Sequence, residues 1–160
     1  PLLIFFISLF VVIGGVEHSG LLEVIGDQFR DVIAEHPKQA ALQLLWVAAI
    51  FSALIDNIPF TAAMIPVLSG LQQDGINVSV LWWALAMGVG MGGNGSHIGS
   101  TANVYIVTVS ERLARETGKP ELAITPMLWI RKGTPVMLVT LVVCSLFIWF
   151  GYDYLFVPNP

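Results

Sequence analysis

The sequence predicts an all-α integral membrane protein, because apolar residues dominate the chain and occur in long runs. Hydrophobic residues make up 56% of the 160 residues and charged residues only 11%, whereas soluble domains carry about 25% charged residues. Several runs approach the roughly 20 residues that a helix needs to cross a bilayer. Two runs are interrupted by short polar segments, which indicates helices broken at membrane depth. We treat residues 1–160 as a single membrane domain, a fragment of a longer protein.

The first 37 residues predict one membrane helix followed by one helix along the membrane surface. Residues 2–16 are apolar, and they lack the basic start and the cleavage site of a signal peptide. Residues 17–37 alternate apolar and charged side chains with a helical period, which is typical of an amphipathic interfacial helix. This segment is either a dedicated arm helix or an ordinary helical connection.

The first break is the polar segment Asp56-Asn57-Ile58-Pro59 within the apolar run 40–69. Proline removes a backbone donor and disfavours helix for the residue before it. Each half of the run is about half a bilayer long, so the run is either a discontinuous spanning helix or a re-entrant hairpin. An ionisable residue such as Asp56 at membrane depth predicts a functional site, since burying it there costs about 2.5–3.5 kcal/mol or more. The structural alternative is a carboxylate that caps the second helix.

The second break lies within residues 78–110, where six glycines occur between Gly88 and Gly99. Glycine in a helix interior costs about 1 kcal/mol relative to alanine, so this run predicts an unwound segment whose carbonyls face a ligand. Close helix packing through glycine is the alternative explanation. A nucleotide-binding loop is not indicated, because no Lys-Ser/Thr pair follows and no strand precedes.

The remaining segments set the predicted topology. Residues 111–132 carry five of the seven basic residues, and an excess of Lys and Arg in a short loop marks the cytoplasmic side. We therefore expect an interfacial segment at 122–133 and a last membrane helix at 134–156, with the C-terminus outside the cell membrane. A net charge of −4 that is scattered along the chain gives no indication of a nucleic-acid partner.

The two breaks carry a resemblance. The segments 56–61 and 92–104 are similar, in order and spacing, to the C-terminal half of the ArsB/NhaD branch of the ion transporter superfamily. That branch includes sodium/proton antiporters, arsenite permeases and the P protein, and it is related to divalent-anion/sodium symporters. The resemblance implies inverted repeats with a re-entrant hairpin at 40–69, an arm helix at 17–37, an elevator-like mechanism and a homodimer. It also implies that a matching N-terminal repeat completes the site.

Together, the resemblance and the polar residues predict a site for Na⁺ or H⁺ where the hairpin tip meets the glycine-rich break. One deep carboxylate, Asp56, can hold either ion, and neutral oxygens beside it suit sodium. The expected ion-binding residues are Asp56, Asn57, Thr61, Gly93, Asn94, Ser96, Thr101 and Asn103. Na⁺ itself is expected at Asp56, Asn57, Asn94 and Ser96, and the backbone is expected to be shaped by Pro59, Gly92, Gly95 and Gly99.

The function expected is Na⁺/H⁺ antiport, without a cofactor and without enzymatic activity. An arsenite or other anion permease, including a dicarboxylate or citrate type, is the alternative on the same scaffold, with half-helix N-termini facing the substrate. An intramembrane aspartyl hydrolase needs two facing carboxylates, and only Asp56 lies deep. A purely structural membrane subunit is a further alternative. His97 departs from the family pattern, and it is either a titrating group or a hydrogen-bonded histidine.

Overall fold

The computed structural model describes residues 18–158 and, before them, residues 4, 7, 8, 11, 12, 14 and 15. Every regular element in the described part of the chain is helical, which confirms the all-α prediction. The helix expected at 2–16 lies largely outside the described residues, and the described residues within it are helical.

The elements follow the chain in a simple order. The α-helices are α2 (Leu21–Glu35), α3 (Pro37–Leu54), α4 (Asn57–Gln73), α5 (Ser79–Gly92), α6 (Thr101–Thr117) and α7 (Pro126–Leu155). Two short 3₁₀ helices connect them, η1 (Gly93–Gly95) after α5 and η2 (Pro120–Leu122) after α6.

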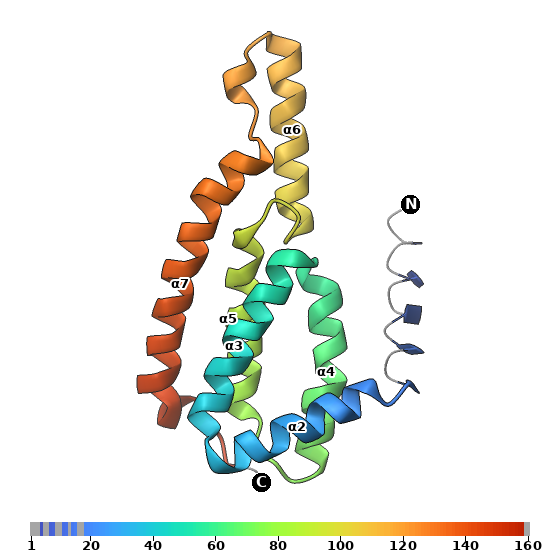
Figure 1. The fold of residues 1–160 in the computed structure, drawn as a ribbon, viewed down its shortest axis with the longest axis vertical. Helices are drawn as coiled ribbons and strands as arrows, with labels where there is room; N and C mark the ends of the chain where they lie inside the picture. Colours follow the sequence, from blue (N-terminus) through green and yellow to red (C-terminus); the bar gives the residue numbers. More distant parts are fainter. Residues whose placement is uncertain (1–3, 5–6, 9–10, 13, 16–17, 159–160) are drawn as a thin grey trace.

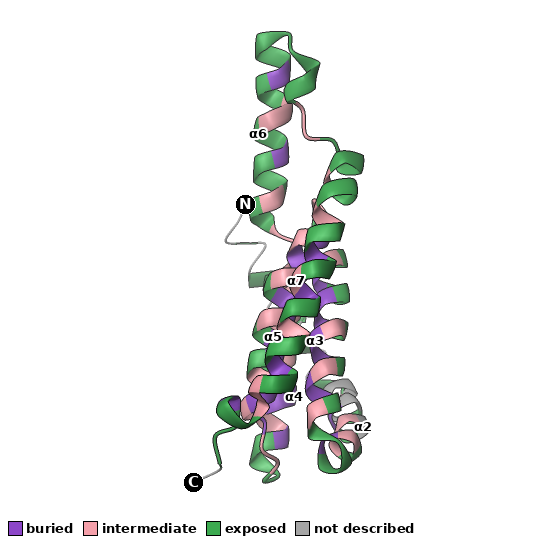
Figure 2. Cartoon of the chain, turned by 90° about the vertical axis from the view of Figure 1, so that its left-hand side faces the viewer, coloured by how far each residue is buried: buried purple, intermediate pink, exposed green. Residues whose placement is uncertain are grey.

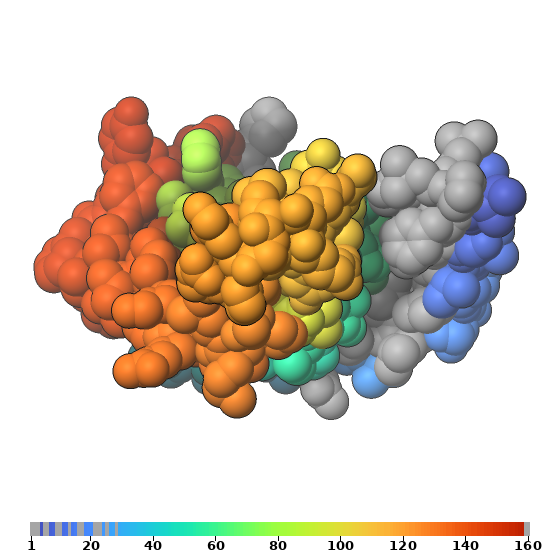
Figure 3. All heavy atoms as spheres, turned by 90° about the horizontal axis from the view of Figure 1, so that it is seen from above, coloured from blue at the N-terminus to red at the C-terminus, as the bar shows by residue number. Residues whose placement is uncertain are grey.

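Helices α3 and α4 form an antiparallel hairpin (Figure 1). The tip of the hairpin lies at mid-height beside the end of α5, and α2 lies across its open end. After the break that follows α5, helix α6 continues to the far end of the molecule, and α7 returns along the whole length. Viewed from that far end, the face is formed largely by α6 and the connection that follows it, in orange (Figure 3). Residues 40–69 thus form a helical hairpin, which is the geometry that a re-entrant arrangement requires.

Local sequence signals account for these helix boundaries. Pro37 occupies the first turn of α3, where its missing N–H costs nothing. The Asp56 side chain caps α4, and the Thr125 side chain caps α7. Gly118 ends α6 in the left-handed conformation with φ of 65°, which only glycine adopts without strain. The polar breaks of the sequence therefore coincide with caps in the fold.

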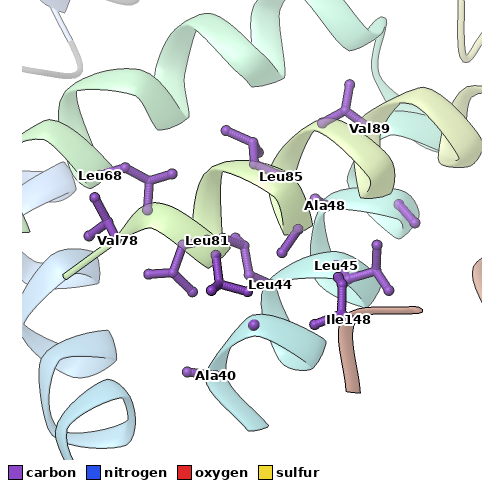
Figure 4. Packing of buried hydrophobic residues seen from close by; sticks show 14 of the residues in the cluster. Ala40, Leu44, Leu45, Ala48, Leu68, Val78, Leu81, Leu85, Val89 and Ile148 are labelled. Atoms are coloured by element: carbon purple, nitrogen blue, oxygen red, sulfur yellow. The ribbon is translucent and has the colours of Figure 1, made fainter. Parts of the chain in front are cut away.

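The core lies between α3, α5 and α7, with the foot of α4 packed against it (Figure 4). Leu44, Leu45 and Ala48 of α3 face Leu81, Leu85 and Val89 of α5, with Ile148 of α7 and Leu68 of α4 beside them. Two glycines of α5 permit this close approach. A Cβ on Gly88 would lie 2.4 Å from the Leu45 carbonyl oxygen, and one on Gly92 would lie 2.4 Å from the Ala49 Cα. The packing explanation therefore holds for these two glycines.

The outer surface of α7 is apolar and exposed (Figure 2). The segment Pro120–Leu155 is the one stretch in the described part of the chain that is long and apolar enough to cross a membrane. Helix α7 is one continuous helix with Pro135 inside it, and it extends across the predicted boundary between the interfacial segment 122–133 and the membrane helix 134–156. A proline within a long helix removes a single backbone hydrogen bond, and here the flanking turns continue the helix past it.

Candidate functional site

The hairpin tip meets the start of α6 through the carboxylate of Asp56. Its Oδ1 accepts a hydrogen bond from the backbone N–H of Ile58 at 3.1 Å, and its Oδ2 accepts one from the Thr101 hydroxyl. Asp56 is half-buried and caps α4, while Thr101 is the first residue of α6. One carboxylate thus joins the N-termini of two helices. The capping role and a place in a functional site are both compatible with this geometry.

Side-chain hydrogen bonds hold the backbone of the glycine-rich break, residues 93–96, in place. The amide nitrogen of Asn103 donates to the carbonyls of Gly93 at 2.8 Å and Ser96 at 3.2 Å. The Ser96 hydroxyl donates to the carbonyl of Ala53, in the last turn of α3. The break is therefore bound both to α6 and to the first arm of the hairpin.

Helix α7 binds the break from another direction. The indole Nε1 of Trp129 donates to the carbonyl of Asn94 at 3.0 Å, and the Thr134 hydroxyl donates to the carbonyl of Gly95 at 2.9 Å. We expected the carbonyls of the break to face a ligand, but those of residues 93–96 all accept hydrogen bonds from side chains. Each carbonyl oxygen has two lone pairs, so these bonds position the oxygens and leave acceptor capacity.

The glycines of the break are required by close contacts. A Cβ on Gly99 would lie 2.8 Å from the carbonyl oxygen of Gly93 and 2.9 Å from that of Ser52. A Cβ on Gly95 would lie 2.5 Å from the sulfur of Met137. Because backbone lies against backbone at Gly99, no side chain fits there without moving the break.

Eight of the expected site residues lie in three places. Asp56, Ser96, Thr101 and Asn103 take part in the hydrogen bonds that join the tip, the break and α6. Asn57, Thr61 and Pro59 lie on the first turns of α4, and the Thr61 hydroxyl donates to the Asn57 carbonyl at 2.8 Å within that helix. Asn94 lines a groove beside Trp129 and Lys132 of α7. The hydrogen bonds of the described residues therefore do not gather Asp56, Asn57, Asn94 and Ser96 into a single coordination shell.

The sequence reasoning missed three contributors: Ser52, Trp129 and Thr134. Ser52 is fully buried in α3, and its hydroxyl donates to the Val89 carbonyl at 2.9 Å. A lone hydroxyl in an apolar run, and a tryptophan whose N–H needs a partner when buried, are the signals that could have indicated them. Their partners lie 35 to 39 residues away in sequence.

The arrangement offers two kinds of chemistry. The N-termini of α4 and α6 carry a partial positive charge, which suits an anion. The Asp56 carboxylate and the hydroxyl of Thr101 supply oxygens, which suit a proton or a hard cation. Because Asp56 lies at both N-termini, its charge offsets their dipoles.

Comparison with known proteins decides the family. A family model described as a citrate transporter matches residues 1–90, which is more than half of the chain and includes the hairpin and most of α5. The chain belongs to the citrate transporter family. The match confirms the resemblance to the ion transporter superfamily and makes the chain part of a membrane transporter.

Individual relatives agree with this membership. The P protein of Mus musculus is 39% identical over 156 residues, which cover 91% of this chain and 18% of that protein. The P protein of Homo sapiens is 38% identical over 146 residues, with 86% and 17% covered. An uncharacterized transporter of Synechocystis is 31% identical over 163 residues, with 91% and 35% covered. The chain thus spans between about a fifth and a third of these relatives, and no solved structure matches it.

Proposed function

We propose that this chain is the C-terminal half of a Na⁺/H⁺ antiporter and that Asp56 is its ion-exchange group. The observation that carries the proposal is the position of this carboxylate, which joins the tip of the hairpin to the start of α6. Ionised, it attracts Na⁺ to the oxygens of the tip. Protonated, it loses its charge and releases the cation, so one group serves both ions in turn.

The neighbouring oxygens complete the proposed site. The Thr101 hydroxyl donates to Asp56, and the Ser96 hydroxyl donates to the Ala53 carbonyl three residues before it. Asn57 begins the helix that Asp56 caps. Asn94 and the lone pairs left on the carbonyls of the break supply further ligands. The matching hairpin and break of an N-terminal repeat provide the other half.

The fold supports an elevator-type movement. Glycine contacts and side-chain hydrogen bonds fix α3, α5 and the break to one another, and they form the moving body. Helix α2 crosses the open end of the hairpin as the arm that links this body to a fixed, dimeric scaffold. In the membrane, the hairpin enters from the outside of the cell. The loop 111–132 is then cytoplasmic, and the C-terminus is outside.

The test is coupled flux in proteoliposomes that contain the full-length protein. An outward Na⁺ gradient drives proton uptake in the wild type, and we expect Asp56→Asn to reduce this flux to the level of empty liposomes. Asp153→Asn is the matched control, because Asp153 is an exposed aspartate at the far end of α7. Unchanged flux in Asp56→Asn, with normal amounts of protein in the membrane, removes Asp56 from the ion site.

Citrate transport is the second candidate, and membership in the citrate transporter family favours it. In this case the N-termini of α4 and α6 and the hydroxyls of Ser96 and Thr101 face a substrate carboxylate, and Asp56 holds the coupling cation. Uptake of radiolabelled citrate by the same proteoliposomes, without Na⁺-driven proton flux, supports this candidate over antiport. If the proteoliposomes instead take up arsenite or another oxyanion, the protein is an anion permease that uses the same arrangement.

A further inference from the structure

A groove at the start of α7 is separate from the contact between Asp56 and Thr101. It has a volume of about 420 Å³ and lies against the break on the α7 side. Its lining is apolar except for one amide and one ammonium group, and it includes Asn94, Ile124, Leu128, Trp129, Lys132 and Val136. Such a groove fits a molecule with a long apolar part and an anionic end.

The charges around the groove favour an anionic partner. Residues 111–132 carry five Lys and Arg against three Glu, and Arg112 is already paired with Glu116 at 2.7 Å. Lys132 and its neighbour Arg131 are exposed, and neither takes part in an ion pair in the described part of the chain. A lysine at the edge of an apolar groove can place its stem on the apolar wall and its ammonium at a phosphate.

The position of the groove favours a lipid rather than a soluble anion. Leu128, Lys132 and Val136 occupy the first turns of α7, where the one long apolar stretch of the described chain begins. Trp129 lies there too, and tryptophan is enriched at the level of lipid headgroups. Trp129 and Lys132 are thus at headgroup level, and Val136, one turn further along α7, is within reach of an acyl chain.

We propose that this groove binds one anionic phospholipid, with its phosphate at Lys132, its glycerol region against Leu128 and Trp129, and an acyl chain along Val136. The Trp129 indole also holds the Asn94 carbonyl of the break at 3.0 Å. A phospholipid that packs on Trp129 therefore stabilises the conformation of the break. The proposal does not depend on which substrate the protein transports.

The test is retention of lipid by the purified, delipidated full-length protein, measured by native mass spectrometry. Phosphatidylglycerol and phosphatidylcholine with the same acyl chains are added separately, and inorganic phosphate is added in a third sample. We expect phosphatidylglycerol to be retained more strongly, and Lys132→Gln to lower its affinity about fivefold, which corresponds to the loss of one cation near an anionic lipid. Val136→Phe fills the groove without a change of charge, and we expect a similar loss.

Two matched variants act as controls. Arg131→Gln removes the neighbouring positive charge, which does not line the groove, and Val139→Phe adds the same ring on α7 outside the groove. We expect both to retain phosphatidylglycerol within about twofold of the wild type. Equal losses in Lys132→Gln and Arg131→Gln overturn the proposal in favour of diffuse attraction. Equal retention of both lipids, binding of inorganic phosphate in place of lipid, or unchanged binding by Val136→Phe also overturns it.

Discussion

The two arms of the hairpin are close in length but differ in how they are held. The first arm, α3, has one face that is buried along nearly its whole length, from Ala40 to Ser52. The second arm, α4, has buried residues only near its foot, at Val67, Leu68 and Leu71 (Figure 2). Buried apolar contacts are the main source of local stability, so the arms differ in how readily each one moves.

The sequence of each arm explains the difference. Helix α3 carries alanines and Ser52 on the face toward α5, where Gly88 and Gly92 let the backbones approach. Helix α4 has no comparable partner near the tip, and Pro66 interrupts its hydrogen bonding. Its upper half is held by the Asp56 carboxylate and by Phe60, which stacks on Phe51 with ring centroids 5.6 Å apart. We infer that α4 is the arm that opens the tip while α3 moves with α5.

The largest effect on stability is expected where α3 packs closely against α5. In Gly92→Ala the new Cβ lies 2.4 Å from both the Cα and the carbonyl oxygen of Ala49. Backbone atoms inside a packed helix pair cannot move aside without separating the helices, so we expect a loss of about 3 kcal/mol in unfolding free energy, at the upper end for overpacking. Thermal unfolding of the full-length protein in detergent measures it.

Gly90→Ala is the matched control for that substitution. Gly90 lies on the same helix, but a Cβ there meets nothing within 4 Å. Alanine is the better helix former by about 1 kcal/mol, so we expect unchanged or slightly higher stability. If Gly90→Ala and Gly92→Ala unfold alike, the close packing of α3 on α5 is not what distinguishes the two arms.

Features of this fold that depend on neighbouring residues were predictable from the sequence, whereas those that depend on residues far apart in the chain were not. The breaks at Asp56–Pro59 and at the glycine-rich run were predictable, because proline, glycine and capping residues act on their own backbone. The choice between a hairpin and a discontinuous helix was open from the residues, because it depends on which way α4 turns after the break. The resemblance, but not the local pattern, indicated the hairpin.

The hydrogen bonds from α7 to the carbonyls of the break were not predictable in this way. Trp129 and Thr134 lie more than 30 residues from the carbonyls that they hold, and no periodic pattern links them to those carbonyls. The continuity of α7 through Pro135 was not predictable for a related reason. Pro135 is a local signal for a helix end, yet α7 continues through it, since a single lost hydrogen bond is a small fraction of a 30-residue helix.

A smaller effect is expected at the tip, where α4 meets α6. A double-mutant cycle of Asp56→Ala and Thr101→Val isolates their hydrogen bond from the cap that Asp56 also provides. Hydrogen bonds to charged groups contribute about 1.5–3 kcal/mol, and partial exposure lowers this, so we expect a coupling energy of about 1–1.5 kcal/mol. Unfolding free energies of the four proteins give the value. Additive effects within about 0.3–0.5 kcal/mol show that the tip is not held to α6 by this contact.

The smallest effect is expected at the foot of the hairpin, where Arg30 of α2 pairs with Asp74 after α4. Both side chains are nearly half exposed, at 42% and 48%, so Arg30→Gln lowers stability by only about 0.2–1 kcal/mol. Its effect is local, because the pair ties the second arm to α2. We expect hydrogen exchange to rise in residues 57–73 and to stay unchanged in residues 37–54. Arg112→Gln breaks an ion pair within α6 and is the control, with hydrogen exchange expected to stay unchanged in both arms. If Arg30→Gln raises hydrogen exchange equally in both arms, the two arms are not independent.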